Sequence, residues 1–333
     1  MQLDTLRERL RGFGAKPLHE RRVLRHWLRA LPQDAPPRRP GDFLPATVRE
    51  GLPVLGLERI ASIRAIHAGS DGSERLVVEL EDGQAVESVL LPKAGLCVST
   101  QVGCAVGCTF CMTGRDGLLR QLGSAEIVAQ VALARKRREV RKVVFMGMGE
   151  PAHNLDAVLE AIDLLASEGD LAQKNLVFST VGDPRVFERL PQGPVRPALA
   201  LSLHTTKNDL RERLLPRAPR MTPEELVGKA NAYAELTGYP IQYQWTLLEG
   251  INDGDDEIDA LARLLKGHYA VVNLIPFNAV SGSGFRRPSP ERCLHLARTL
   301  SSRGVLAKLR QSAGQDVDGG CGQLRARVLA RVA

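Results

Sequence analysis

The chain has 333 residues, of which 44% are hydrophobic, so it can bury the core of one large domain with a small appendage. Six cysteines do not make the disulfide framework of a small secreted protein, and no apolar run approaches the length of a membrane span. With an Arg-rich start that lacks an apolar signal segment, these features predict a cytoplasmic protein, and the net charge of +7 favours a polyanionic partner such as RNA.

Residues 1 to about 35 predict helices, because apolar side chains such as Leu6, Leu10 and Leu24 recur at helical spacing. Arginines alternate with them, which fits either the solvated face of a small helical module or an appendage that contacts RNA. The Pro-rich segment 36–40 is expected to end this region.

Residues 56–93 carry short runs of alternating polarity around a turn at 69–72. The runs 75–80 and 85–90 predict two antiparallel strands, because polar and apolar residues alternate in them. We expect this part of the chain to form a short antiparallel β extension.

From Leu96 onward, strand-like runs alternate with helical ones, which predicts parallel strands joined by crossover helices. The expected strands are 96–99, 142–145, 176–179, 198–203, 241–247, 271–275 and 305–309. The expected helices include 124–138, 157–168, 223–237, 255–266 and 290–303. The number of units predicts an α/β chain built on an incomplete barrel of about six strand–helix units. The expected parts are an accessory helical domain (1–50), a β-hairpin linker region (51–95) and the barrel (96–333).

Three cysteines, Cys104, Cys108 and Cys111, follow the first barrel strand at the spacing C-x3-C-x2-C. Thiolates this close together can turn inward on one loop and hold an iron–sulfur cluster. A cubane cluster would then keep one iron open for a ligand that is not protein. A zinc site is the alternative, but zinc needs a fourth ligand. The other cysteines each stand alone: Cys97, Cys293 and Cys321.

Glycine and polar residues follow several of the predicted strands. These pieces are 147–151, 179–182, 202–204 and 273–278. Each piece alone fits an ordinary turn, and His204 alone fits a structural histidine. The carboxyl ends of barrel strands meet on one face, however, and the cysteine motif lies there too. A zwitterionic cofactor needs such amides, hydroxyls and carboxylates, so we expect a cofactor site.

Together these motifs resemble the radical S-adenosylmethionine (SAM) adenine methyltransferases of ribosomal and transfer RNA, the RlmN/Cfr family. The resemblance rests on the cysteine motif with an aromatic residue before its third cysteine, and on Cys97 seven residues before the motif. It also rests on the pieces 147–151, 202–204 and 273–278 and on the tail 321–324. It extends from the N-terminal helices to Leu324, nearly the whole chain.

The resemblance implies a [4Fe-4S] cluster held by Cys104, Cys108 and Cys111. It implies contacts to SAM from Gly149, Glu150, Ser179, Ser202, Leu203, His204 and Asn278. The implied partners are 23S ribosomal RNA, with transfer RNA as a further substrate, and an electron donor such as flavodoxin or ferredoxin. A monomer without a membrane partner is expected.

The resemblance also implies a reaction that uses two SAM molecules in each turnover. Cys321 takes a methyl group from the first, and a 5′-deoxyadenosyl radical made from the second removes a hydrogen from that methyl group. The resulting methylene radical adds to adenine C2. Cys97 then attacks Cys321 and releases the product, leaving a disulfide, and Glu87 matches the family's proposed proton acceptor.

The chemistry explains why two lone thiols are needed. Adenine C2 is not nucleophilic, so a carbon radical is required, and the resulting thioether must then be broken by a second thiolate. From the residues alone, Cys97 fits a small buried apolar side chain, Cys321 a thiol on a Gly-rich loop, and Cys293 a core position.

The chain departs from the family's pattern at three places. The segment 312–321 lacks an Arg and an Asp that the family carries before the methylated cysteine, and 216–219 and 179–182 differ from Pro-x-Asn and Ser-Thr-Ser-Gly. Three alternatives therefore stay open. They are a divergent paralogue that acts on another RNA or on adenine C8, a radical SAM enzyme with a non-RNA substrate, and a catalytically silent RNA-binding paralogue.

Overall fold

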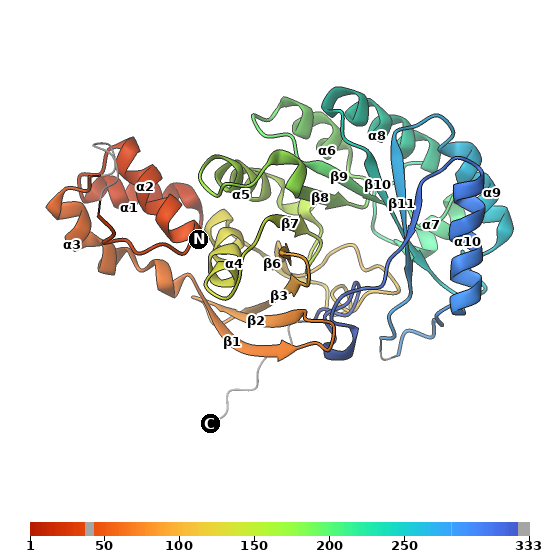
Figure 1. Cartoon of the computed structure of the whole chain (residues 1–333), viewed down its shortest axis with the longest axis horizontal. Coiled ribbons are helices and arrows are strands. Elements are labelled where there is room, and N and C mark those ends of the chain that lie inside the picture. The colour runs from red at the N-terminus through yellow and green to blue at the C-terminus, as the bar shows by residue number, and fades with distance from the viewer. Residues whose placement is uncertain (37–42, 281, 326–333) are drawn as a thin grey trace.

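The computed structural model describes residues 1–36, 43–280 and 282–325. Its frame is a ten-stranded sheet with the order β1-β2-β3-β4-β7-β8-β9-β10-β11-β12. Neighbouring strands are parallel from β4 to β12, and the sheet curls into an incomplete barrel with helices outside it (Figure 1). The predicted α/β fold is confirmed.

The parallel strands are β4 (Gly95–Cys97), β7 (Lys142–Phe145), β8 (Leu176–Thr180), β9 (Ala198–Ser202), β10 (Ile241–Leu247), β11 (Ala270–Pro276) and β12 (Ala307–Leu309). The helices around them are α4 (Ser124–Arg135), α5 (Leu155–Ser167), α6 (Pro184–Arg189), α7 (Asn208–Leu214), α8 (Pro223–Thr237), α9 (Asp255–Leu264) and α10 (Pro290–Ser302). Each predicted strand and each predicted barrel helix has a counterpart here, with ends shifted by up to three residues. The short helices α6 and α7 were not predicted, because their few residues carry no sustained helical period.

The antiparallel part of the chain continues the barrel sheet. It consists of β1 (Ala61–Ala68), β2 (Glu74–Leu80) and β3 (Ala85–Leu91), and β3 pairs antiparallel with β4. The predicted antiparallel strands 75–80 and 85–90 are confirmed as β2 and β3. Because β3 is hydrogen-bonded to β4, side chains of this extension lie beside the barrel interior.

The N-terminal helices form a lobe beside α4 (Figure 1). They are α1 (Leu3–Gly12), α2 (Pro17–Leu28) and α3 (Ala46–Leu55). The boundary placed at residue 50 falls inside α3, and most of the predicted Pro-rich breaker 36–40 lies outside the described residues. The buried side chains Leu3, Leu6 and Leu10 belong to the same hydrophobic cluster as the barrel residues. The lobe and the barrel therefore share one continuous core.

Arginines of α2 bind the barrel. Arg21 Nε and Arg25 Nε donate to the two carboxylate oxygens of Glu168 at 2.7 and 2.8 Å, and Arg29 Nε donates to the Glu168 carbonyl at 2.8 Å. Glu168 is buried just after α5. These arginines therefore attach the lobe to the barrel, a role that neither sequence interpretation included.

Replacing Glu168 by glutamine is expected to lower the free energy of unfolding by about 2 kcal/mol, because two hydrogen bonds between charged groups lose their acceptor charge. Urea unfolding followed by circular dichroism measures the change. Glu188→Gln is the control, since Glu188 is exposed, and it is expected to leave stability within about 0.5 kcal/mol of wild type. Equal midpoints for the two variants would contradict this attachment.

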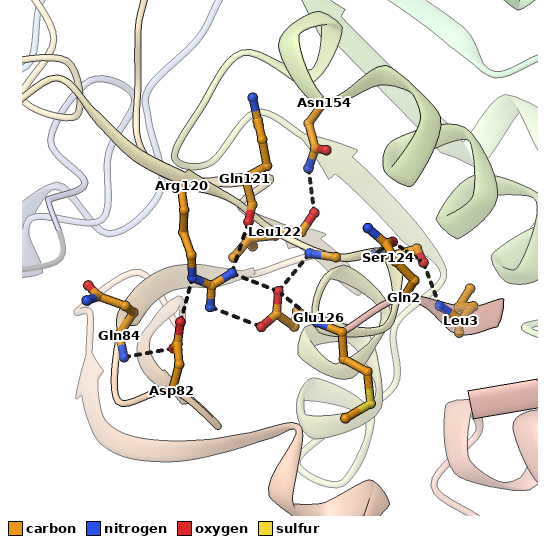
Figure 2. A network of polar contacts seen from close by, with 12 residues as sticks. Gln2, Leu3, Asp82, Gln84, Arg120, Gln121, Leu122, Ser124, Glu126 and Asn154 are labelled. Carbon is orange, nitrogen blue, oxygen red and sulfur yellow. Dashed lines mark hydrogen bonds and ion pairs between the residues drawn. The ribbon is translucent and has the colours of Figure 1, made fainter. Parts of the chain in front are cut away.

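A second polar network joins three parts of the chain (Figure 2). Arg120 lies in β6 (Leu118–Gln121) and pairs with Asp82, in the turn between β2 and β3, at 2.6 Å. It also pairs with Glu126 in the first turn of α4 at 3.0 Å. Ser124, at the start of α4, accepts a hydrogen bond from Leu3 N at 2.8 Å. The lobe, the β extension and the strand after the cysteine loop are thus held together.

Among the described residues, no helix combines the length and the apolar character that crossing a bilayer requires.

Candidate active site

The cysteine loop starts and ends on a two-stranded antiparallel sheet that sequence reasoning missed. Its strands are β5 (Gln101–Gly103) and β6, each too short to carry a periodic signal. Gly103 has φ +79°, and a Cβ there would lie 2.1 Å from the Gly117 carbonyl, so only glycine fits. Cys104 N donates to that same carbonyl at 2.9 Å. The loop is therefore closed at its base.

The three motif thiols line one cavity together with residues at the carboxyl ends of the barrel strands. Burial raises the pKa of Cys104 to about 12. Burial, followed by the neighbouring Cys111 and Cys104, also raises the pKa of Cys108. Thiolates gathered in this way repel one another and need a bound cation to become stable.

One cavity contains these thiols together with most of the predicted cofactor residues. Its lining combines the cysteine loop, the strand ends and the C-terminal loop. The predicted residues that line it are Cys104, Cys108, Cys111, Gly149, Glu150, Ser179, Ser202, His204 and Cys321. Leu203 does not line it, because its side chain is fully buried in the main core. Cys97, Glu87 and Asn278 lie outside the lining and are described below.

Glu150 follows β7 and is buried in the cavity wall. Its carboxylate accepts hydrogen bonds from Ala152 N at 3.2 Å and Val181 N at 3.0 Å. Burial raises its pKa to about 7, and these hydrogen bonds, with one from Thr180, oppose the rise. A bound ammonium group would stabilise the charged form.

Gln101 holds the backbone before Glu150 in place. Its Oε1 accepts from Glu150 N at 2.7 Å, and its Nε2 donates to Gln121 Oε1 at 2.8 Å. Gly149 has φ +106°, and a Cβ there would meet the Gln101 side chain at 2.6 Å. Glycine is therefore required at this turn.

His204 follows β9 with φ +65°, which is uncommon for a residue other than glycine. Its Nδ1 accepts from Thr246 N at 2.9 Å, its carbonyl accepts from Asn252 Nδ2 at 2.7 Å, and its ring stacks edge-on with Phe110. Burial lowers its pKa to about 3, so the ring is neutral and Nε2 carries the proton. His204 can therefore donate a hydrogen bond within the cavity.

Arg211, on α7, is a buried residue that the sequence did not single out. Its guanidinium donates to the carbonyls of Ser202 at 2.9 Å, Leu203 at 2.7 Å and Val181. It therefore joins the ends of β8 and β9 at the cavity. Burial lowers its pKa to about 10, and the Cys108 and Glu150 side chains oppose that shift. The sequence did not indicate that Arg211 is buried, because α7 is too short to show a helical period.

Asn278 positions the loop that carries Cys321. Its Nδ2 donates to the Cys321 carbonyl at 3.0 Å and to Ser312 Oγ at 2.8 Å. Its Oδ1 is buried without a hydrogen-bond partner in the described part of the chain, so it can accept from a ligand. Cys321 is exposed as a residue. Neighbouring protein atoms nevertheless shield its thiol from water, and this desolvation raises the pKa of the thiol. A hydrogen bond with Ser312 and the charge of Arg310 oppose the rise.

Cys97 lies on β4 opposite Val89 of β3 and Val144 of β7. Burial raises the pKa of its thiol, and the nearby Cys321 raises it further. The two lone thiols, 224 positions apart in sequence, therefore come close enough to interact electrostatically.

Glu87, on β3, is linked to both ends of the C-terminal loop. Its carboxylate pairs with Arg75, whose Nε donates to the Val317 carbonyl at 2.5 Å. It also accepts from Arg325 N at 2.8 Å. Burial raises the pKa of Glu87 and the charge of Arg75 opposes this. A carboxylate in this position can accept a proton beside the loop.

Comparison with known proteins identifies the family. Residues 98–265 match the Radical SAM superfamily. The chain belongs to this superfamily.

Its relatives narrow the assignment. A probable RNA methyltransferase of Leptothrix cholodnii is 68% identical over 332 residues, which cover 99% of this chain and 96% of that protein. A protein of the same description from Pseudomonas aeruginosa PAO1 is 65% identical, covering 98% and 96%. The crystal structure of a radical SAM methyltransferase from Sphaerobacter thermophilus is 36% identical, with a TM-score of 0.87 and 98% of each chain covered. Within the radical SAM superfamily, the chain therefore belongs to the family of these methyltransferases.

The donor set of this radical SAM protein fits a cluster with one open iron. The three motif thiols line the cavity, and the neighbouring Glu150, His204 and Asn278 offer groups that suit an amino acid and a nucleoside. Within residues 1–36, 43–280 and 282–325, no three His, Cys, Asp or Glu side chains converge as ligands of a single metal ion. Cysteine ligands of a cluster bind separate irons and need not converge in this way.

Proposed function

We propose that this radical SAM protein methylates an adenine carbon, C2, in 23S ribosomal RNA, with transfer RNA as a further substrate. The observation that carries the proposal is that Cys321 lies near the motif cysteines and also near Cys97. It lines the cavity of the motif cysteines, and it acts electrostatically on Cys97. A radical SAM enzyme with a non-RNA substrate has no need for Cys97 and Cys321 in addition to the motif cysteines.

The proposed cluster ligands are Cys104, Cys108 and Cys111, and the proposed SAM contacts come from the cavity wall. These contacts are Gly149, Glu150, Ser179, Ser202, Leu203, His204 and Asn278, with Leu203 acting through its backbone. When bound, the cluster and two SAM molecules supply a methyl group and a carbon-centred radical. Glu150 is suited to hold the amino group, because its carboxylate is buried and its charged form gains from an ammonium partner.

Cys321 is the proposed methyl carrier. Its sulfur holds the one-carbon unit and becomes bonded through that carbon to adenine. The adduct then loses one electron, which the oxidised cluster would accept, and Glu87 takes the proton that leaves the ring carbon. The Cys97 thiolate then attacks the Cys321 sulfur and forms a disulfide. The electron pair of the broken carbon–sulfur bond stays on the added carbon, which takes up one proton and becomes the methyl group of the product. The hydrogen bonds from Asn278 and Arg75 to the loop support this role, because they fix where Cys321 lies.

The proposed setting follows from this chemistry. Reducing the cluster requires a one-electron donor such as flavodoxin or ferredoxin, and reducing the disulfide requires a thiol-reducing compartment such as the cytoplasm. We propose that the protein works as a monomer.

Cys321 is expected to carry a methyl group before any RNA is bound, because the carrier must be loaded before it can form a radical. Peptide mass spectrometry of protein made in cells is expected to show one added methyl on the Cys321 peptide. The Cys293 peptide serves as the internal control and is expected to be unmodified, since that thiol is buried on α10. An unmodified Cys321 in an active, cluster-loaded preparation would reject the proposed mechanism.

A further inference from the structure

A group of basic side chains lies on the inner face of the barrel, away from the helices. Lys142 begins β7. On this strand Val143 and Phe145 belong to the main core, which also contains residues of the surrounding helices and is here called the outer core. Val144 instead packs against a separate cluster of Val177, Ala198 and Ala200, here called the inner cluster. Because side chains alternate along a strand, Lys142 shares the inner face with Val144. It is half-buried there.

Two further cations reach this face from β12, the last strand of the sheet. Ala307 and Leu309 pack on the outer core. Lys308 therefore points the other way, and it is exposed. Arg310 follows the strand, is also exposed, and donates from Nε to Asn273 Oδ1 at 2.8 Å. We call Lys142, Lys308 and Arg310 the inner cation group.

The inner cation group lacks acidic partners. In the described part of the chain, none of its members forms an ion pair, whereas the arginines of α2 share a buried glutamate. Burial, then the charges of Arg310 and Lys308, lower the pKa of Lys142. Like charges this close cost free energy, and an anionic ligand placed among them would remove that cost.

The inner cation group also borders both lone thiols. Arg310 acts electrostatically on Cys321, and Lys142 lies on β7 beside β4, where Cys97 pairs with Val144. On its far side β12 pairs with no other strand of the described sheet, so a polymer can approach from that edge.

We propose that Lys142, Lys308 and Arg310 bind backbone phosphates of the RNA beside the adenine presented to Cys321. This inference rests on the proposed function and names the residues that position its substrate. RNA fits better than an acidic protein, because phosphates repeat along the backbone and can meet cations that come from two strands, β7 and β12. Such contacts position a nucleic acid and leave base recognition to other groups.

The test compares two triple variants of the full-length, cluster-loaded protein. One is Lys142→Gln/Lys308→Gln/Arg310→Gln. The control is Lys229→Gln/Arg263→Gln/Lys266→Gln, which removes the same charge from exposed positions at the outer helices α8 and α9. Filter binding of transcribed 23S ribosomal RNA and of transfer RNA is measured between 50 and 200 mM KCl, a range in which counterion release dominates affinity.

The inner triple variant is expected to bind roughly 100-fold more weakly at 50 mM salt, with the slope of log affinity against log salt smaller by about two. The control triple is expected to stay within a few fold of wild type. Lys308→Gln alone is expected to weaken binding roughly tenfold, and because Lys308 is exposed its loss does not threaten folding. Iron content and circular dichroism are compared for every variant.

Two outcomes overturn the inference in different ways. If wild type binds RNA and the inner triple and the single variant match the control, the inner cation group is not the phosphate site, and the proposed function stands. If wild type binds neither RNA, both the inference and the proposed function fail.

Discussion

Cys97→Ala is expected to leave RNA covalently attached to Cys321. Alanine removes the thiolate that is proposed to break the carbon–sulfur bond, so the reaction stops after the carbon–carbon bond forms. Cys97 is the thiol outside the cluster motif on which Cys321 acts electrostatically. A denaturing gel is expected to show a slower protein band that returns to its normal position after ribonuclease treatment.

Two variants control for this result. Cys293→Ala also removes a buried thiol, on α10, and is expected to release RNA normally. The double variant Cys97→Ala/Cys321→Ala is expected to form no adduct, because the carrier sulfur is gone. Normal turnover by folded Cys97→Ala protein would mean that another group releases the product and that Cys97 is a packing residue.

Replacing Cys104, Cys108 and Cys111 together by alanine is expected to remove bound iron and sulfide almost entirely. No other set of three cysteines lies within so short a segment, and a cluster with no protein ligand cannot stay bound. Anaerobic iron and sulfide analysis measures the effect. SAM cleavage by the same preparation is expected to fall to background.

Cys293→Ala is the matched control here as well, because it removes one buried thiol far from the motif in sequence. It is expected to keep wild-type iron and to lose about 1 kcal/mol of stability at most. Wild-type iron in the triple variant would show that other ligands hold the metal, and the assignment of the motif would be wrong.

The α/β order of elements and the location of the cysteine motif could both be predicted from the sequence. Both depend on local signals. Alternating strand and helix periods predict a parallel sheet, and parallel strands bring their carboxyl ends to one face. Glu150, Ser179, Ser202 and His204 could therefore be expected from the sequence to lie at one cavity, and they do.

The contacts between distant segments could not be predicted and become visible in the folded chain. The approach of Cys321 to Cys97, and the link from Glu87 through Arg75 to Val317, depend on a loop folding back over the β extension. Sequence periodicity does not indicate such contacts, because it reports the local structure of each segment and not which distant segments will meet.

The charged residues show the same division most clearly. Sequence counts a net charge of +7 and an Arg-rich start, but it cannot pair charges across the fold. In the structure, arginines of α2 bind Glu168, whereas Lys142, Lys308 and Arg310 meet without an acidic partner among the described residues. Ion pairing depends on the distance between charges in space. The folded chain is therefore needed to distinguish cations that hold the structure together from cations that can bind an anionic ligand.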